Sequence, residues 1–360
     1  MTTDSVGGVW NHSVELAAGL QALGCEIHLV VFGGRLSDGQ RRLLDLCGPM
    51  ACIESELRLE WMDHPWDDLE SAAELLLSIA RACQPHVIHL NSYALAARPW
   101  PAPILVGAHS CVCSWFEAVR GACPPTDWNI YRRRVAAGLT MADAVVAPSR
   151  AMLNAVSRCN DVPLRGQVIP NGSTPLVPVS ALSREAWILT AGRFWDEAKN
   201  LQVLDAAAKR TKWRVAAAGP DTDPSGRSSV TPAHVEMLGI LSPQALRRAM
   251  CAASIYAAPA LYEPFGLCVL EAAQCGCALV LSDIPTFREI WAGAAEFVDA
   301  RDPDAWRRAL NGLTDDPIRV ARLASAARNR AASLTREAMA SAYLRAYVSL
   351  GVRESLPFAA

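Results

Sequence analysis

Short apolar runs recur along this chain, and segments with apolar residues at helical spacing separate them. Parallel strands need a crossover connection, which is usually a helix, so strands that alternate with helices favour a parallel sheet. The pattern therefore predicts an α/β fold built on doubly wound parallel sheets. The expected strands include residues 27–32, 87–90, 104–108 and 144–147 in the first half, and 187–191, 214–218, 255–258 and 278–282 in the second.

The chain divides into two such series. Its 360 residues are enough for two domains, because a domain usually takes about 100–200 residues. Residues 173–183 are rich in Pro and Ser and have no periodicity, which is typical of a linker. We expect a first domain over 1–172, a second over 184–335, and a final helix with its tail over 336–360. That helix carries Met339, Tyr343, Leu344 and Tyr347.

Composition narrows the class of protein. The net charge of −2 gives no reason to expect a nucleic-acid partner. No run of about 18 apolar residues predicts a membrane span, and residues 1–4 lack the basic and apolar regions of a signal peptide. The twelve cysteines include no C-x-x-C pair, so we expect them to be reduced. These observations predict a cytoplasmic protein.

The most informative segment is Glu263-Pro264-Phe265-Gly266-Leu267, followed by Glu271. It joins a buried strand to a helix, and Pro264 and Gly266 prevent a regular helix across the junction. Glu263 should therefore lie in a loop, and Glu271 about one turn inside the helix. The free N–H groups at a helix start bind anions, and nearby carboxylates suit hydroxyl groups. For an isolated pair of glutamates, a solvated loop residue and a dipole-complementing residue are the more common interpretation.

A second segment, Gly192-Arg193 to Lys199-Asn200, also leaves a strand and enters a helix. Arg193 offers a planar bidentate contact and Lys199 a point charge, so both suit a diphosphate. Two surface cations near a helix start are an equally good interpretation of this segment alone.

Two features of the first half carry weaker signals. Gly7-Gly8 precedes a helical segment and could let a ligand approach the backbone, although a tight turn is as good an interpretation. Only a few residues precede it, so we expect either that the start lies inside a longer gene product or that its strand is truncated, with a weakened amino-terminal half. His109 follows a predicted strand, where open α/β sheets bind ligands, but a lone histidine is more often structural.

We predict no metal site. Asp221-Thr222-Asp223 has the D-x-D spacing of some metal-dependent transferases, but it stands between Gly219-Pro220 and Pro224-Ser225-Gly226. That composition is typical of a turn. The run Arg132-Arg133-Arg134 lies on a predicted helix and is best explained as a solvated face, with an acidic acceptor or a membrane surface as the lesser alternative.

Taken together, these motifs resemble those of the retaining GT-B glycosyltransferases of family 4 (glycosyl transferases group 1), with their E-x7-E motif. The resemblance extends over essentially the whole chain and is more specific in the second half. It implies two Rossmann-like domains with a nucleotide sugar in the cleft between them, and a C-terminal helix that crosses back to the first domain. The motifs occur in the order Gly7-Gly8, His109, Pro170-Asn171-Gly172, Gly192-Arg193, Lys199-Asn200, Glu263 to Gly266 and Glu271.

The resemblance also implies a role for individual residues. Arg193 and Lys199 would bind the diphosphate and stabilise the departing nucleotide. Glu271 would accept hydrogen bonds from the ribose, while Glu263 would contact the donor sugar beside the backbone of Phe265, Gly266 and Leu267. His109 would contact the donor sugar near the reacting carbon, and Gly8 would let the first domain approach the phosphate.

The implied activity is metal-independent transfer of a sugar, of the hexosyltransferase type and with no cofactor, from a nucleotide-diphosphate sugar to an acceptor hydroxyl. The acceptor would be a glycan, a lipid or a small molecule, and peripheral contact with the inner face of a membrane is compatible with this. A sugar-nucleotide epimerase or phosphorylase of similar architecture, or a non-catalytic nucleotide-sugar-binding protein, remains the alternative.

Overall fold

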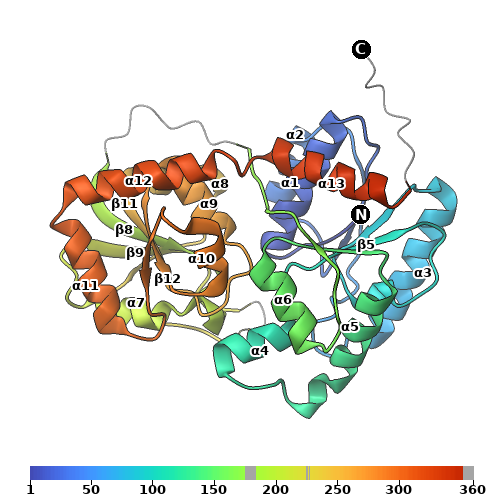
Figure 1. Cartoon of the computed structure of the whole chain (residues 1–360), viewed down its shortest axis with the longest axis horizontal. Coiled ribbons are helices and arrows are strands. Elements are labelled where there is room, and N and C mark those ends of the chain that lie inside the picture. Colours follow the sequence, from blue (N-terminus) through green and yellow to red (C-terminus); the bar gives the residue numbers. More distant parts are fainter. Residues whose placement is uncertain (175–183, 224–225, 227, 352–360) are drawn as a thin grey trace. The chain divides into compact units, whose positions relative to one another are not determined.

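A computed structural model describes residues 1–174, 184–223, 226 and 228–351. The chain forms two compact units (Figure 1): Met1–Gly172 with Arg336–Ala360, and Ser173–Thr335. Most of the predicted linker, residues 175–183, lies outside the described residues.

All strand pairs of the first unit are parallel, as expected. One sheet has the order β1-β2-β3 and the other β4-β5-β6-β7, and β1 and β4 are neighbours. The strands thus follow the order 3-2-1-4-5-6-7, and the chain reverses its direction of winding between β1 and β4. The strands are β1 (Thr2–Asp4), β2 (His28–Phe32), β3 (Ala51–Glu54), β4 (Ile88–Leu90), β5 (Ile104–Gly107), β6 (Ala144–Ala147) and β7 (Gln167–Val168).

A strand does form before the Gly7-Gly8 turn, although the sequence shows no apolar run there. It is short, and its residues Thr2, Thr3 and Asp4 are polar yet buried. Thr2 pairs with Val30 of β2, and its side-chain oxygen accepts from the backbone N–H of Asn91 at 2.8 Å. Polar side chains can be buried in this strand when they find hydrogen-bond partners within the fold, as Thr2 does.

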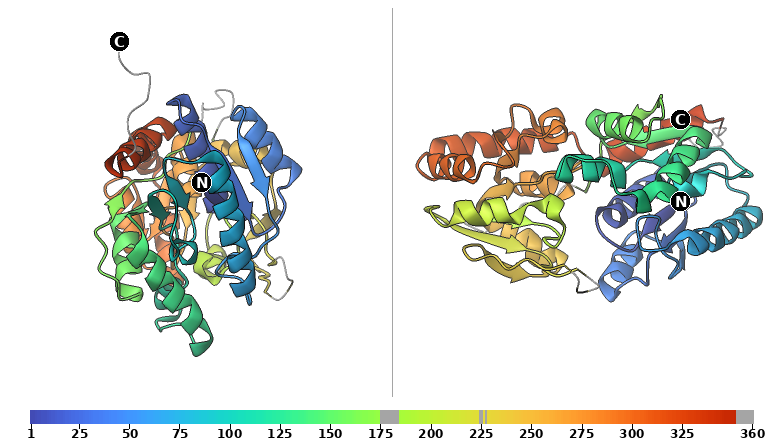
Figure 2. Two further views of the ribbon diagram at one scale, coloured as in Figure 1. Left: turned by 90° about the vertical axis from the view of Figure 1, so that its right-hand side faces the viewer. Right: turned by 90° about the horizontal axis from the view of Figure 1, so that it is seen from below.

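The final helix α13 (Arg336–Ser349) returns to the first unit, which confirms that prediction. It packs against α1 (Gly8–Ala22) (Figures 1 and 2). Arg336 pairs with Glu15 at 2.6 Å, and Tyr343 and Tyr347 are buried. The other helices of this unit are α2 (Asp38–Leu46), α3 (Trp66–Cys83), η1 (Ala94–Ala96), α4 (Val112–Arg120), η2 (Thr126–Trp128), α5 (Asn129–Met141) and α6 (Arg150–Cys159).

The second unit has one parallel sheet with the order β10-β9-β8-β11-β12-β13. Counted from its own first strand, the order is again 3-2-1-4-5-6, which is typical of dinucleotide-binding domains. Its winding reverses between β8 and β11. The strands are β8 (Glu185–Ala191), β9 (Arg214–Ala218), β10 (Glu236–Gly239), β11 (Ala253–Ala258), β12 (Ala278–Ser282) and β13 (Glu296–Val298).

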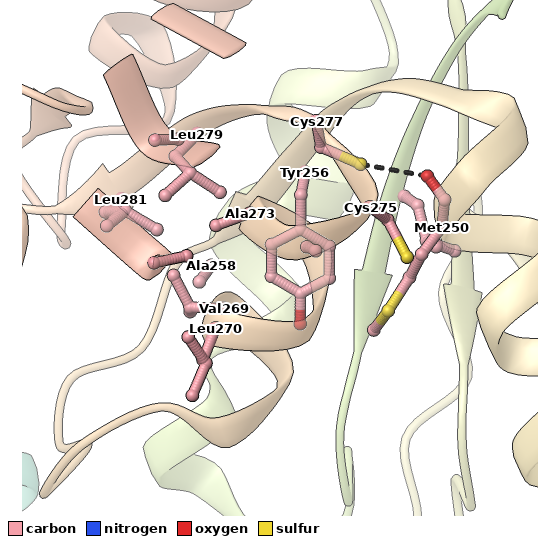
Figure 3. Packing of buried hydrophobic residues seen from close by; sticks show 14 of the residues in the cluster. Met250, Tyr256, Ala258, Val269, Leu270, Ala273, Cys275, Cys277, Leu279 and Leu281 are labelled. Atoms are coloured by element: carbon pink, nitrogen blue, oxygen red, sulfur yellow. Dashed lines mark hydrogen bonds between the residues drawn. The ribbon is translucent and has the colours of Figure 1, made fainter. Parts of the chain in front are cut away.

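Helices cover both faces of this sheet (Figure 1). Alternate residues of each strand point to opposite sides, and both sets are apolar and buried. In β12, Leu279 and Leu281 join one buried cluster and Val280 joins the other. Figure 3 shows the first cluster, in which the thiol of Cys277 also donates to the carbonyl of Met250 at 3.0 Å. The helices are η3 (Glu197–Lys199), α7 (Leu201–Ala208), α8 (Pro243–Ala252), α9 (Leu267–Cys275), α10 (Pro285–Trp291), α11 (Pro303–Thr314) and α12 (Pro317–Ala331).

Candidate functional site

The two most informative sequence segments meet in the second unit, at the carboxyl ends of β8 and β11. Open α/β sheets bind ligands where the winding reverses, because the loops there diverge to opposite faces. The backbone at this point is tightly packed. Gly219 has a φ of 142°, and a Cβ on it would overlap the carbonyl oxygen of Gly192. Gly192 in turn donates to the carbonyl of Ala218 at 3.1 Å, so the strand ends are fixed to each other.

Tyr256 of β11 also fixes the end of β8. Its hydroxyl lies 3.3 Å from the backbone nitrogen of Ala191 and 3.2 Å from its carbonyl oxygen. The ring belongs to the buried cluster beneath the site (Figure 3), and burial raises the pKa of Tyr256 well above its ordinary value. The hydroxyl therefore stays protonated and holds the residue that precedes Gly192-Arg193.

The segment that carries Lys199 is tied to the loop that carries Glu263. Asn200 adopts a left-handed conformation, with a φ of 52°. Its side-chain Nδ2 donates to the carbonyls of Pro259 at 2.9 Å and Ala300 at 2.7 Å. The backbone N–H of Leu261 donates to Ala198 at 2.8 Å. Asparagine is one of the few residues other than glycine that tolerates this backbone conformation, and here its side chain also links three loops.

Lys199 and Glu263 form an ion pair with 2.5 Å between Nζ and Oε2. Their side chains are 22% and 19% exposed, so water screens the pair only in part. Burial alone lowers the pKa of Lys199, but the Glu263 carboxylate outweighs it and the pKa ends above its ordinary value. Lys199 is therefore an ammonium ion at neutral pH, held ready beside the start of α9.

Arg193 lies in the same cluster, since its charge acts on Lys199. The guanidinium carbon of Arg193 lies 5.4 Å from the ring centre of Trp195. A cation over an aromatic face loses little of its capacity to donate from its edge. Trp195 therefore orients the Arg193 guanidinium while leaving N–H groups for an anion.

The start of α9 has the predicted form. Glu263 lies in a loop, Gly266 precedes the helix with a φ of 92°, and Leu267 is its first residue. Glu271 stands one turn inside. The Phe265 side chain is 3% exposed and belongs to the core, so only its backbone is left for a ligand.

Glu271 and Glu263 both act on Cys268, in the first turn of α9. Burial and then the Glu271 carboxylate raise the pKa of Cys268 to about 12, so the thiol is neutral at ordinary pH. Arg193, Lys199, Glu263 and Glu271 thus come together in one unit, at one end of its sheet.

Gly8 and His109 belong to the first unit. Gly8 is the exposed first residue of α1, and Gly7 before it has a φ of 81°, which favours glycine. His109 follows β5, half-buried, with its ring centre 4.3 Å from that of His12 of α1. Its Nε2 lies 3.0 Å from Oδ1 of Asn91, the residue after β4.

The sequence alone does not predict a role for several residues of this arrangement. No role was assigned to Asn91, His12, Trp195 or Tyr256, because each meets its partner through the order of strands or helices. Asn91 offered one usable signal, since it directly follows a predicted strand. Nowhere in the described part of the chain do three His, Cys, Asp or Glu side chains gather as metal ligands would. Within the same residues, no helix has the length and apolar character needed to cross a bilayer.

Family models match both halves of the chain. The model described as Glycosyltransferase Family 4 matches residues 6–174, and that described as Glycosyl transferases group 1 matches residues 185–316. Among curated proteins, the alpha-maltose-1-phosphate synthase of Mycolicibacterium smegmatis is 30% identical over 285 residues, 68% of each chain. The phosphatidyl-myo-inositol mannosyltransferase of the same organism is 31% identical over 150 residues, 39% of each chain.

Solved structures share the fold over nearly the full length. Sucrose-phosphate synthase from Thermosynechococcus elongatus superposes with a TM-score of 0.77 at 18% identity, covering 97% of this chain and 95% of that one. HepE from Anabaena, solved in complex with UDP-glucose, superposes with a TM-score of 0.72 at 15% identity, covering 96% of each chain.

Proposed function

The chain belongs to the group 1 glycosyltransferases of family 4, and on that premise we propose that it moves a sugar from a nucleotide-diphosphate sugar to an acceptor hydroxyl. We further propose that the configuration at the anomeric carbon is retained and that no metal ion takes part. The observation that carries the proposal is the Lys199–Glu263 pair beside Arg193 at the start of α9.

The hardest charge to stabilise in such a reaction is the one that develops on the leaving diphosphate. Arg193 and Lys199 supply two fixed cations for it, and the first-turn N–H groups of α9 add partial positive charge. Since Lys199 is protonated at neutral pH, this stabilisation is available without rearrangement of protons. The complex of Anabaena HepE with UDP-glucose supports a nucleotide-diphosphate sugar as the class of donor.

The carboxylates take the hydroxyl-bearing parts of the donor. Glu271 accepts from the ribose and Glu263 from the sugar, beside the backbone of Phe265, Gly266 and Leu267. When a diphosphate draws Lys199 toward itself, an oxygen of Glu263 becomes available to a sugar hydroxyl. Gly8 and His109 of the first unit have the roles that the family resemblance implies: Gly8 lets the backbone approach the phosphate, and His109 contacts the donor sugar near the reacting carbon.

The test begins with a panel of UDP- and GDP-sugars in a thermal-shift assay, since a bound donor raises the melting temperature. The donor that stabilises most is then used in turnover assays with Lys199→Ala, and with Lys209→Ala as an exposed control in the same unit. Loss of one group that stabilises developing charge should lower kcat/KM by about 10²–10³-fold. The Lys209 variant should match the wild type, and near-normal kinetics of Lys199→Ala would reject the site.

Two further measurements separate the finer parts of the proposal. Turnover with an excess of EDTA should equal turnover without it if no metal takes part. NMR of the product should show the anomeric configuration of the donor. A labelled donor incubated without acceptor separates transfer from epimerisation, and tight donor binding without turnover would indicate a binding protein.

A further inference from the structure

Asn91 occupies the point in the first unit where the winding of the sheet reverses. It follows β4, and β4 neighbours β1. Its backbone N–H donates to Oγ1 of Thr2 at 2.8 Å, so Asn91 itself joins the two sheets of this unit. Open α/β sheets bind ligands at such a point, and hydrogen bonds to Thr2 of β1 and Ser13 of α1 hold the Asn91 side chain there.

The orientation of the Asn91 amide follows from its neighbours. One of its atoms lies 2.8 Å from the carbonyl oxygen of Thr2, and a carbonyl oxygen only accepts hydrogen bonds. That atom must be Nδ2, which also donates to Oγ of Ser13 at 3.1 Å. The remaining atom, Oδ1, is therefore the one that lies 3.0 Å from Nε2 of His109.

This orientation decides where the His109 proton resides. Since Oδ1 has no hydrogen to give, Nε2 of His109 must be the donor. Burial lowers the pKa of His109 to about 4, so the imidazole is neutral at ordinary pH and carries one proton. Nδ1 is then unprotonated. It has no hydrogen-bond partner among the residues that the structure describes.

The bond between Asn91 and His109 lies in close-packed surroundings. Gly107 of β5 lies directly behind the bond: a Cβ there would overlap Oδ1 of Asn91 and would stand 2.8 Å from Nε2 of His109. Two other imidazoles face the group, and burial keeps the pKa of each well below its ordinary value. His12 of α1 packs on the His109 ring, and His89 of β4 bonds through Nδ1 to the Tyr347 hydroxyl at 2.8 Å.

We propose that Asn91 is a positioning residue that fixes His109 as the Nε2–H tautomer, so that Nδ1 of His109 accepts a hydrogen bond from a hydroxyl group of the donor sugar. The inference rests on the proposed function for the identity of the substrate. It specifies the chemistry of recognition: the group that meets His109 is a hydroxyl, because phosphate and carbonyl oxygens only accept. A donor that lacks this hydroxyl is a poor substrate.

The tautomer is measured first, without reference to activity. In protein labelled with ¹⁵N-histidine, long-range ¹H–¹⁵N spectra distinguish the two tautomers, and a His109→Gln sample assigns the signal. We expect the Nε2–H form in the wild type. Gly107→Ala should break the bond without removing either partner and populate both tautomers. Gly166→Ala, which crowds Leu153 elsewhere in the same unit, is the matched control and should leave His109 unchanged.

Asn91→Leu and Asn91→Asp extend the test if Gly107→Ala does not fold. The leucine variant removes the acceptor, so the Nε2–H preference should be lost. The aspartate variant keeps an oxygen facing Nε2 and should retain the tautomer while raising the pKa of His109, because an adjacent anion favours imidazolium. A predominant Nδ1–H form in the wild type, or a tautomer that ignores Asn91→Leu, overturns the inference.

Donor analogues test the recognition. Among singly deoxygenated donors, one should lose about 10-fold or more in kcat/KM with the wild type, since the loss of one hydrogen bond has about this effect. The same analogue should lose little further with Asn91→Leu, while other analogues should keep their wild-type ratios. If every analogue keeps its ratio, the inference fails although the transferase stands. If no nucleotide sugar binds or reacts, the proposed function fails although the tautomer result stands.

Discussion

The Lys199–Glu263 pair allows the sharpest prediction about the site. At 2.5 Å, with side chains 22% and 19% exposed, it lies between an exposed pair and a buried one. Exposed pairs contribute about 0.2–1 kcal/mol, and breaking a buried pair costs about 3–5 kcal/mol. We expect a coupling free energy of about 2 kcal/mol from the double-mutant cycle of Lys199→Met and Glu263→Gln, because both partners retain a fifth of their exposure.

The cycle is measured by urea unfolding of the whole chain, together with peptide-level hydrogen exchange over residues 253–282, since two units need not unfold as one. Each single variant should lose about 2 kcal/mol, and the double variant hardly more. The matched control is Lys212–Asp315 in the same unit, with 2.6 Å between charges but side chains 56% and 57% exposed. Its cycle should give no more than about 0.5–1 kcal/mol.

Glu263→Gln should lower the stability of the fold but strengthen the binding of a diphosphate. Because Glu263 competes with a diphosphate for Lys199, Glu263→Gln should bind a free nucleoside diphosphate more tightly, by about 10-fold if about 1.4 kcal/mol of the pairing is released. Turnover of the sugar donor should fall in that variant, since its carboxylate is gone. A coupling near zero, or weaker diphosphate binding by Glu263→Gln in calorimetry, would refute the reasoning.

The other predictions concern the loop around Lys199 and its charge. Asn200→Ala removes two side-chain hydrogen bonds and leaves alanine at a φ of 52°, so the free energy of unfolding in urea should fall by about 2–3 kcal/mol and donor binding should weaken. Asn200→Gly removes the same bonds but tolerates that φ, so its free energy of unfolding should fall by less. Equal losses in the two variants would show that the backbone conformation is unimportant. The raised pKa of Lys199 means that its stabilising effect is complete below its ordinary pKa of 10.5 and is lost as pH rises through the folded-state value. The difference in stability between wild type and Lys199→Met should therefore be constant from about pH 6 to 9 and shrink in alkali, and a difference that grows in alkali would contradict this assignment.

The sequence predicts best where the signal is local. Strands β11 and β12 are apolar on both faces because helices cover both, so their runs stand out in the sequence. The sequence interpretation missed β3, β7, β10 and β13, each of which lies at an end of its sheet. An edge strand has one neighbour and more exposure, so its residues need no continuous apolar run. The α9 start was predicted because Pro264 and Gly266 determine it locally.

The first unit shows where local reasoning ends. Its first strand is buried without being apolar, since Thr2 is satisfied by a residue far along the chain. His12 is one polar residue in a helical pattern, and nothing in its neighbourhood indicates that it packs on His109. Such contacts depend on the order of the strands, which the alternation of strands and helices leaves open.

The return of α13 to the first unit has a consequence for synthesis. Residues 1–172 emerge from the ribosome long before the helix that carries Tyr343 and Tyr347, whereas residues 173–335 form a continuous segment. The nascent amino-terminal unit must therefore wait, with part of its interior unfilled, while the later unit acquires its structure. The environment of His89 and His12 is completed only when α13 has docked, because both rings pack against Tyr343.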